Sequence, residues 1–262
     1  MIIDTHSHLT DKHFEELLPF IEMAKEAHVS GALVVATTAQ DSPGCVELAR
    51  KHSGLRATVG IHPNNCCQAG TDDWERIVEL AKEPEVAALG ETGLDRYWDD
   101  CPWEMQVDYF KRHLHLSEET GLPVVIHTRE CAEETLGILQ AEASQAGLTL
   151  NGVMHSFTGP LKVAEGCLDL GLYISFAGML TFKNAQEIRD IAREIPDDRV
   201  LVETDSPYLT PHPFRGKRPN HPALVAETLK CLAEVRGTTV ERCARLTTEN
   251  AERLFGPWDG HF

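Results

Sequence analysis

The chain has 262 residues, of which 42% are hydrophobic and 25% charged, a composition that excludes a disordered or fibrous protein. Its 24 basic and 41 acidic residues give a formal net charge of -17, which argues against a protein that holds nucleic acid tightly on a basic surface. The apolar runs are too short for a membrane span, and the first residues lack the basic and apolar regions of a secretory signal. We therefore expect a cytoplasmic protein with no membrane partner.

Short apolar or β-branched runs recur along the chain, and a longer stretch with helical spacing follows most of them. The predicted strands are 2–5, 32–37, 56–61, 86–90, 123–126, 152–154, 172–176 and 200–202. The predicted helices are 17–27, 74–81, 104–119, 185–194 and 223–235, with a further helix start at Thr238-Thr239-Val240-Glu241. Eight strand–helix units without a linker predict one α/β domain over residues 1–262, a (β/α)8 TIM barrel, a fold that typically needs about 250 residues.

The cysteines and several of the 13 histidines show no pattern that indicates chemistry. The cysteines, at positions 45, 66, 67, 101, 131, 167, 231 and 243, form no CxxC pair, so we expect reduced and partly buried side chains. The histidines at 13, 28, 52, 113, 115 and 261 fall in predicted helices, in loops or at the terminus. We expect these six on the solvated surface without a functional role.

Six of the eight predicted strands end in His, Glu or Asp, at the end of a TIM barrel where active sites are built. These residues are His6 and His8, His62, Glu91 and Asp95, His127, His155 and Asp205. His6 and His8 share one face of an extended segment. The expected ligands are four imidazoles and two carboxylates, more than one tetrahedral site needs: His6, His8, His127, His155, Glu91 and Asp205. They suit two divalent cations about 3.5–4 Å apart that share a carboxylate, and Zn, Mn, Mg and Fe all accept such ligands.

Two acidic residues lie one step deeper in the predicted strands. Period two places Asp4 below His6 and Glu203 below Asp205. We expect both carboxylates to hydrogen-bond ligand imidazoles and fix their tautomers. Pairing of Glu203 with a buried Arg or Lys is the alternative.

Basic residues near the predicted site suggest phosphate contacts. Residues 206–226 contain no Asp or Glu but include His212, Arg215, Lys217, Arg218 and His221. This basic loop either contacts substrate phosphates or is a solvated segment anchored by its prolines. Arg129 lies on the face of His127 by period two and either reaches a phosphate or pairs with Glu91 or Glu203.

Seven motifs in order resemble those of the TatD family of metal-dependent deoxyribonucleases. They are DTHSHL at 4–9, VGIHP at 59–63, GETGLDRYW at 90–98, VIHTRE at 125–130, MHSFTG at 154–159, ETDSPYLTPHPFRGKRPNHP at 203–222 and TTENAERLFG at 247–256. The resemblance implies one metal on His6, His8 and Asp205. It implies a second metal on His127 and His155, with Glu91 as the bridge. It also makes Asp205 the general base and His62 a substrate contact.

The sequence differs from related enzymes at two positions near the predicted site. Arg218-Pro219-Asn220-His221 stands where many relatives have an Asn-Glu or Asn-Gln pair, so substrate choice could differ. Glu91 occupies the place of the carbamylated strand-four lysine of dihydroorotases and phosphotriesterases, which argues against those enzymes.

The resemblance implies a nuclease that hydrolyses phosphodiester bonds in DNA, with 3′-5′ exonuclease action and RNA as a further substrate. The expected partner is single-stranded DNA or a strand end, and no obligate protein partner is implied. Two alternatives stay open: a small-molecule amidohydrolase or esterase with the same two metals, and a barrel that binds metals for structure. Four aromatic residues after site strands either stack on a base or pack in the core or rim, namely Tyr97, Trp98, Trp103 and Phe157.

Overall fold

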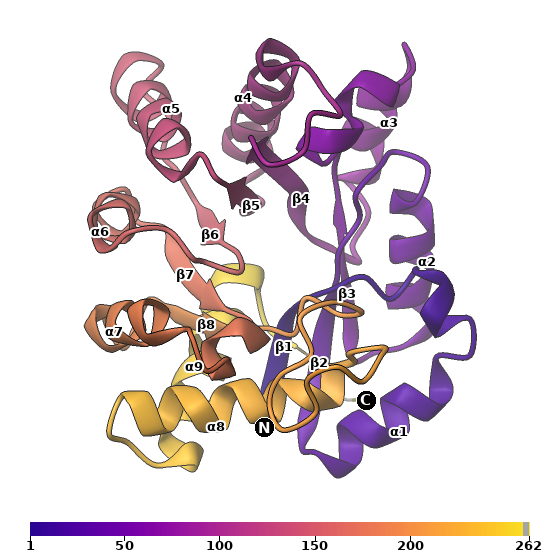
Figure 1. Cartoon of the computed structure of the whole chain (residues 1–262). Coiled ribbons are helices and arrows are strands. Elements are labelled where there is room, and N and C mark those ends of the chain that lie inside the picture. Colours follow the sequence, from indigo (N-terminus) through magenta and orange to yellow (C-terminus); the bar gives the residue numbers. More distant parts are fainter. Residues whose placement is uncertain (259–261) are drawn as a thin grey trace.

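The computed structural model describes residues 1–258 and 262, and its eight strands form one parallel sheet in chain order. The strands are β1 (Ile2–Ser7), β2 (Val29–Val34), β3 (Leu55–Val59), β4 (Val86–Asp95), β5 (Val124–Arg129), β6 (Gly152–Met154), β7 (Tyr173–Phe176) and β8 (Val200–Val202). A parallel bridge between Ser7 and Ser206 joins the end of β1 to the segment after β8. The sheet therefore closes into the predicted (β/α)8 barrel, with its helices outside (Figure 1).

The predicted helices are present with ends shifted by a few residues. The helices are α1 (Leu18–Glu26), α2 (Ser42–Lys51), α3 (Asp73–Leu80), α4 (Trp103–Thr120), α5 (Ala132–Gln145), α6 (Leu161–Asp169), α7 (Gln186–Glu194), α8 (Val225–Val235) and α9 (Val240–Phe255). The Thr239 side chain caps α9 by accepting a hydrogen bond from the Arg242 backbone N–H at 3.2 Å. Helices α2, α5 and α6 were not predicted; each contains a glycine, which lowers helix propensity.

Short 3-10 helices lie in four of the connections: η1 (Lys12–Phe14), η2 (Pro63–Gln68), η3 (Gly178–Thr181) and η4 (Pro222–Leu224). Among the described residues, none of the helices has the length and apolarity that a membrane crossing requires.

The barrel interior has its own apolar layer. Side chains from seven of the strands contact one another there, including Ile3, Leu33, Val125, Val153 and Leu201. Residues two positions further along β5, β6 and β8 face the same interior, one layer higher. These residues are His127, His155 and Glu203, so the polar site lies directly above an apolar floor.

Two strands depart from regular pairing beside the expected ligands. Between β1 and β2, Asp4 pairs with Ala32 and Ser7 with Val34, so three steps on β1 match two on β2. Between β4 and β5, Leu89 pairs with Val124 and Thr92 with Ile126, which is the same mismatch. Each is a β-bulge, a device that changes the direction in which side chains point. The bulges contain His6 and Glu91 and set the faces on which these two side chains lie.

Most of the remaining cysteines and histidines lie as expected. All eight cysteines are free, and six are buried: Cys45, Cys66, Cys101, Cys131, Cys167 and Cys243. His13, His28 and His115 are exposed and His52 is partly exposed, while His261 falls outside the described residues. The expectation for His113 was wrong, because this residue is 0% exposed, on the buried face of α4. Its Nε2 accepts a hydrogen bond from the Ile61 backbone N–H at 3.2 Å, an interaction that needs a buried histidine.

Candidate metal centre

The carboxylate of Glu91 lies at the centre of the site, with imidazoles on both sides. Its Oε1 is 2.9 Å from His127 Nδ1 and 2.9 Å from His155 Nε2. Its Oε2 is 3.4 Å from His6 Nε2 and 3.7 Å from His8 Nε2. Each carboxylate oxygen therefore faces a different pair of imidazoles. This is the arrangement that a carboxylate bridging two cations needs.

Asp205 joins the pair formed by His6 and His8. Its Oδ1 lies 3.5 Å from His8 Nε2 and 3.8 Å from His6 Nε2. The backbone of Asp205 has a positive φ of 54° and donates its N–H to the His6 carbonyl at 2.9 Å. Such a conformation is uncommon outside glycine and is held by its surroundings. The hydrogen bond that closes the barrel thus also positions this carboxylate.

Three of these four imidazoles donate a hydrogen bond through the ring nitrogen that points away from Glu91. His8 Nδ1 donates to the Val35 carbonyl at 3.0 Å. His127 Nε2 donates to Asp95 Oδ2 at 3.0 Å, and His155 Nδ1 donates to Glu203 Oε1 at 3.2 Å. In the neutral imidazole the other nitrogen then carries the lone pair, and in all three residues that nitrogen faces the centre. Metal-binding histidines show this pattern, so the donor set fits divalent cations.

The electrostatics of the site show a strongly polar cluster that lies almost out of water. Burial favours the neutral form of Glu91, but His155 and His62 outweigh it and hold the pKa of Glu91 well below its usual value. Burial likewise opposes the charged imidazole of His155, yet Glu91 and Glu203 raise its pKa well above the ordinary value. Glu91 therefore favours a proton on the imidazole nitrogens that face it, and a bound cation would take the place of that proton.

His62 differs from the other site histidines in its tautomer. Its Nδ1 accepts a hydrogen bond from the Asn64 backbone N–H at 3.1 Å. The proton of the neutral ring is therefore on Nε2, which lies 3.4 Å from Glu91 Oε1. A protonated ring nitrogen cannot bind a metal but can donate a hydrogen bond. His62 thus has the chemistry of a donor at the edge of the centre.

The two carboxylates below the ligands, Glu203 and Asp4, have different partners. Glu203 is fully buried and bonds His155, the type of contact predicted for it, rather than a Lys or Arg. Asp4 bonds Thr204 instead, accepting from its hydroxyl at 2.6 Å and from its backbone N–H at 2.8 Å. Within the described residues the buried His6 Nδ1 has no hydrogen-bond partner, so the expected bond from Asp4 to an imidazole is absent. The bulge between Asp4 and Ser7 breaks the period-two rule on which that expectation depended.

Asp95 was placed at the site by its strand position but was given no role. Its side chain bonds His127 through Oδ2, and the same oxygen accepts from Asn64 Nδ2 at 3.0 Å. The signal was present in the sequence, because Asp95 follows Glu91 by four residues in one strand and so shares its face. It was missed because the predicted strand stopped at Gly90.

Arg129 does not form the ion pair that was one of the two roles expected for it. Its side chain is exposed, and its guanidinium lies 3.8 Å from the centre of the Tyr97 ring. Among the described residues it forms no ion pair, so pairing with Glu91 or Glu203 was wrong. A phosphate contact stays a prediction.

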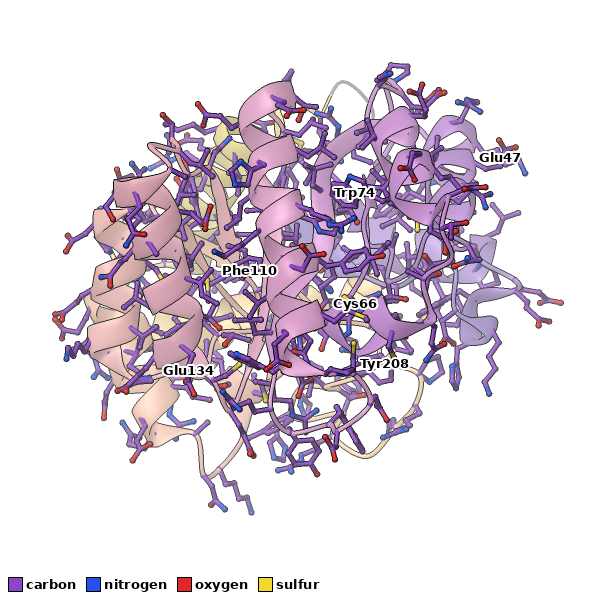
Figure 2. The ribbon with its side chains drawn as sticks, turned by 90° about the horizontal axis from the view of Figure 1, so that it is seen from above. Glu47, Cys66, Trp74, Phe110, Glu134 and Tyr208 are labelled. Atoms are coloured by element: carbon purple, nitrogen blue, oxygen red, sulfur yellow. The ribbon has the colours of Figure 1, made fainter. Side chains whose placement is uncertain are left out.

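The basic loop after β8 presents most of its charges to solvent. Arg215 stacks on Phe182 at 4.0 Å, Lys217 lies 5.3 Å from the Phe214 ring, and both are exposed. Figure 2 shows Tyr208, which begins this loop, toward the edge of the molecule where loops gather. His221 departs from the expectation, since it is only 8% exposed, and burial lowers its pKa. It belongs to the packing of the loop rather than to a basic surface.

Comparison with known proteins agrees with this geometry. The profile of the family described as TatD related DNase matches residues 3–256. An uncharacterized metal-dependent hydrolase of Bacillus subtilis, YabD, is 40% identical, and the match covers 97% of this chain and 99% of that protein. A 3′-5′ ssDNA/RNA exonuclease TatD of Erwinia amylovora is 35% identical over 90% of this chain and 92% of its own.

A solved structure agrees as well. The crystal structure of YJJV, a TatD homologue from Escherichia coli K12, superposes with a TM-score of 0.91 at 28% identity and covers 98% of both chains. The range matched by the family profile contains all the residues of the centre. The protein is a hydrolase, and the chain belongs to the TatD-related DNase family.

Proposed function

We propose that the protein is a metal-dependent nuclease that removes nucleotides from the 3′ end of single-stranded DNA and also accepts RNA. The observation that carries the proposal is the position of Glu91, whose two oxygens face separate pairs of imidazoles at 2.9 Å and at 3.4–3.7 Å. Membership of the family and the likeness to the Erwinia exonuclease support the choice of nucleic acid.

Each residue of the centre has a defined part in phosphodiester hydrolysis. Two divalent cations, one on His6, His8 and Asp205 and one on His127 and His155, with Glu91 shared, would polarise the phosphoryl group and lower the pKa of a water molecule. Asp205 would hold the first cation and accept the proton of the attacking water. The bond between phosphorus and the leaving oxygen then breaks, and that oxygen takes the proton from Asp205. His62 donates its Nε2 proton as a hydrogen bond to a phosphoryl oxygen, which stabilises the added negative charge of the transition state.

The unpaired basic side chains favour a phosphate substrate over a neutral amide or lactone. Many exposed cations of the protein pair with Asp or Glu, for example Arg50 and Lys230. Within the described residues, Arg129, Arg215 and Lys217 form no ion pair; Arg129 ends β5, and the other two lie in the loop after β8. These cations are available to an anionic substrate, while the rest of the acidic surface lets a cleaved product leave.

Assays with defined metals test the proposal. The purified enzyme is stripped with EDTA, reloaded with Mg, Mn or Zn, and given end-labelled single-stranded DNA, RNA, cyclic amides and lactones. We expect shortening of the nucleic acids from the 3′ end, and loss of that activity in Glu91→Gln and Asp205→Asn. Turnover of the amides or lactones without any cleavage of nucleic acid contradicts the proposal. Equal cleavage by both variants would identify a contaminating nuclease.

A further inference from the structure

Two large aromatic side chains are exposed in the segment that follows β4. Tyr97 is 49% exposed and Trp98 is 50% exposed, and their rings meet edge to face with centroids 4.9 Å apart. The other two aromatic candidates are covered, since Phe157 is 2% exposed and the Trp103 ring lies 3.8 Å below the Arg96 guanidinium. Tyr97 and Trp98 therefore carry the free aromatic surface of this segment. Leaving it in water is unfavourable, which suggests a ligand.

Arg129 adds a cation to this surface. Its guanidinium lies 3.8 Å from the centre of the Tyr97 ring and 5.8 Å from that of Trp98. The Arg129 carbonyl accepts a hydrogen bond from the Arg96 backbone N–H at 2.9 Å, which joins the aromatic segment to the end of β5. Because its charge is unpaired within the described part of the chain, Arg129 is free to bind an anion while it stays stacked on Tyr97.

One buried carboxylate ties the aromatic segment to the metal centre. Asp95 is 2% exposed, and its Oδ1 accepts hydrogen bonds from the backbone N–H groups of Tyr97 at 2.8 Å and Trp98 at 3.0 Å. Its other oxygen, Oδ2, accepts the Nε2 proton of His127 at 3.0 Å. The backbone that carries the two rings is thus bonded to the same carboxylate as an imidazole that faces Glu91. This shared carboxylate places the start of the aromatic segment next to the centre.

We propose that Tyr97, Trp98 and Arg129 form an aromatic platform that binds a nucleobase beside the scissile phosphate of single-stranded nucleic acid. The inference rests on the proposed nuclease function and names how that site holds its substrate. An aromatic face stacks on any base, so the platform binds without sequence preference. In a duplex the base faces are covered by their neighbours, so the platform selects single strands and frayed ends.

The platform also explains how a strongly acidic protein could bind a polyanionic substrate. A surface of net charge -17 repels a polyanion at long range. Stacking supplies affinity that depends little on phosphate neutralisation. Binding through the platform should therefore weaken less with added salt than binding through many Lys and Arg contacts.

Binding of a hydrolysis-resistant oligomer tests the platform apart from catalysis. The metal-loaded enzyme is titrated with a short phosphorothioate oligothymidylate, and tryptophan fluorescence and fluorescence anisotropy are followed. We expect Trp98→Ala and Tyr97→Ala to weaken binding on the order of tenfold to a hundredfold, the effect of one lost base–aromatic stack. Trp98→Phe keeps an aromatic face and should bind nearly as well as the wild type. Met23→Ala removes another exposed apolar side chain, 42% exposed on α1, and should change nothing.

An oligomer with abasic 3′ positions supplies the second arm. It keeps the phosphates but lacks the stacking group, so it should bind wild type as weakly as the normal oligomer binds Trp98→Ala. Equal affinity for both oligomers, or equal binding by wild type and both alanine variants, overturns the platform. In either case 3′ shortening of DNA by the wild type would leave the nuclease proposal standing. Base-dependent binding without cleavage under any metal would instead support the platform and refute the nuclease.

Discussion

Replacement of His113 by leucine tests the buried tautomer that the structure shows. The imidazole is fully buried, its Nε2 accepts from the Ile61 N–H at 3.2 Å, and its Nδ1 donates to the Tyr109 carbonyl at 2.7 Å. Leucine keeps a similar volume but offers no acceptor. The buried Ile61 N–H then loses its partner, which costs about 1–3 kcal/mol of unfolding free energy near neutral pH.

The pH dependence of this cost follows from the pKa of His113. Burial lowers the pKa from 6.5 to about 4, so below pH 6.5 the proton binds the unfolded chain in preference to the folded one. The stability that neutral His113 contributes is complete above 6.5 and is lost as the pH falls toward 4. A pKa lowered by this amount corresponds to about 3 kcal/mol over the whole range, or about 1.4 kcal/mol for each pH unit.

Urea unfolding of both proteins in EDTA measures the difference. We expect wild type to exceed His113→Leu in stability at about pH 7, and the gap to narrow steadily as the pH is lowered. Other titrating groups are common to both proteins and cancel in the difference. His52→Leu, at the C-terminal end of α2 with a partly exposed imidazole, is the control and should show no such narrowing. A gap for His113→Leu that does not change with pH would refute a buried, neutral imidazole.

Three further outcomes test the centre and its scaffold. EDTA should abolish nuclease activity and lower the melting temperature, with both restored by added metal; full activity in a metal-free protein contradicts the centre. Glu203→Gln should weaken metal binding about 10–100-fold in competition with a metal indicator, because the carboxylate orients His155, and an unchanged affinity would exclude that role. Gly93→Ala should destabilise by about 3 kcal/mol or more in urea, since φ is 134° and a Cβ would lie 2.1 Å from the His127 carbonyl. The matched Gly121→Ala, at φ 75° with nothing within 4 Å, should cost only about 1 kcal/mol, and equal costs would contradict this packing.

The architecture and the members of the centre could be predicted from local patterns. Eight apolar runs separated by helical stretches indicate a barrel, and a barrel brings all its strand ends to one rim. The positions of His127 and His155 could be predicted without information on neighbouring strands. Each lies at the end of a regularly paired strand, where side chains alternate between the two faces. Residues that are far apart in the sequence therefore meet at this rim because of the order of the strands in the barrel.

The chemistry of individual side chains depended on pairing between distant strands. The bulges that hold His6 and Glu91 exist only where β1 meets β2 and β4 meets β5, so the period-two rule could not foresee them. The tautomers of His8 and His62 likewise depend on the Val35 carbonyl and on a backbone N–H of η2. Periodicity reports which face of its own strand a residue occupies. Bulges, hydrogen-bond partners and burial arise from contacts between segments, and only the folded barrel brings those segments together.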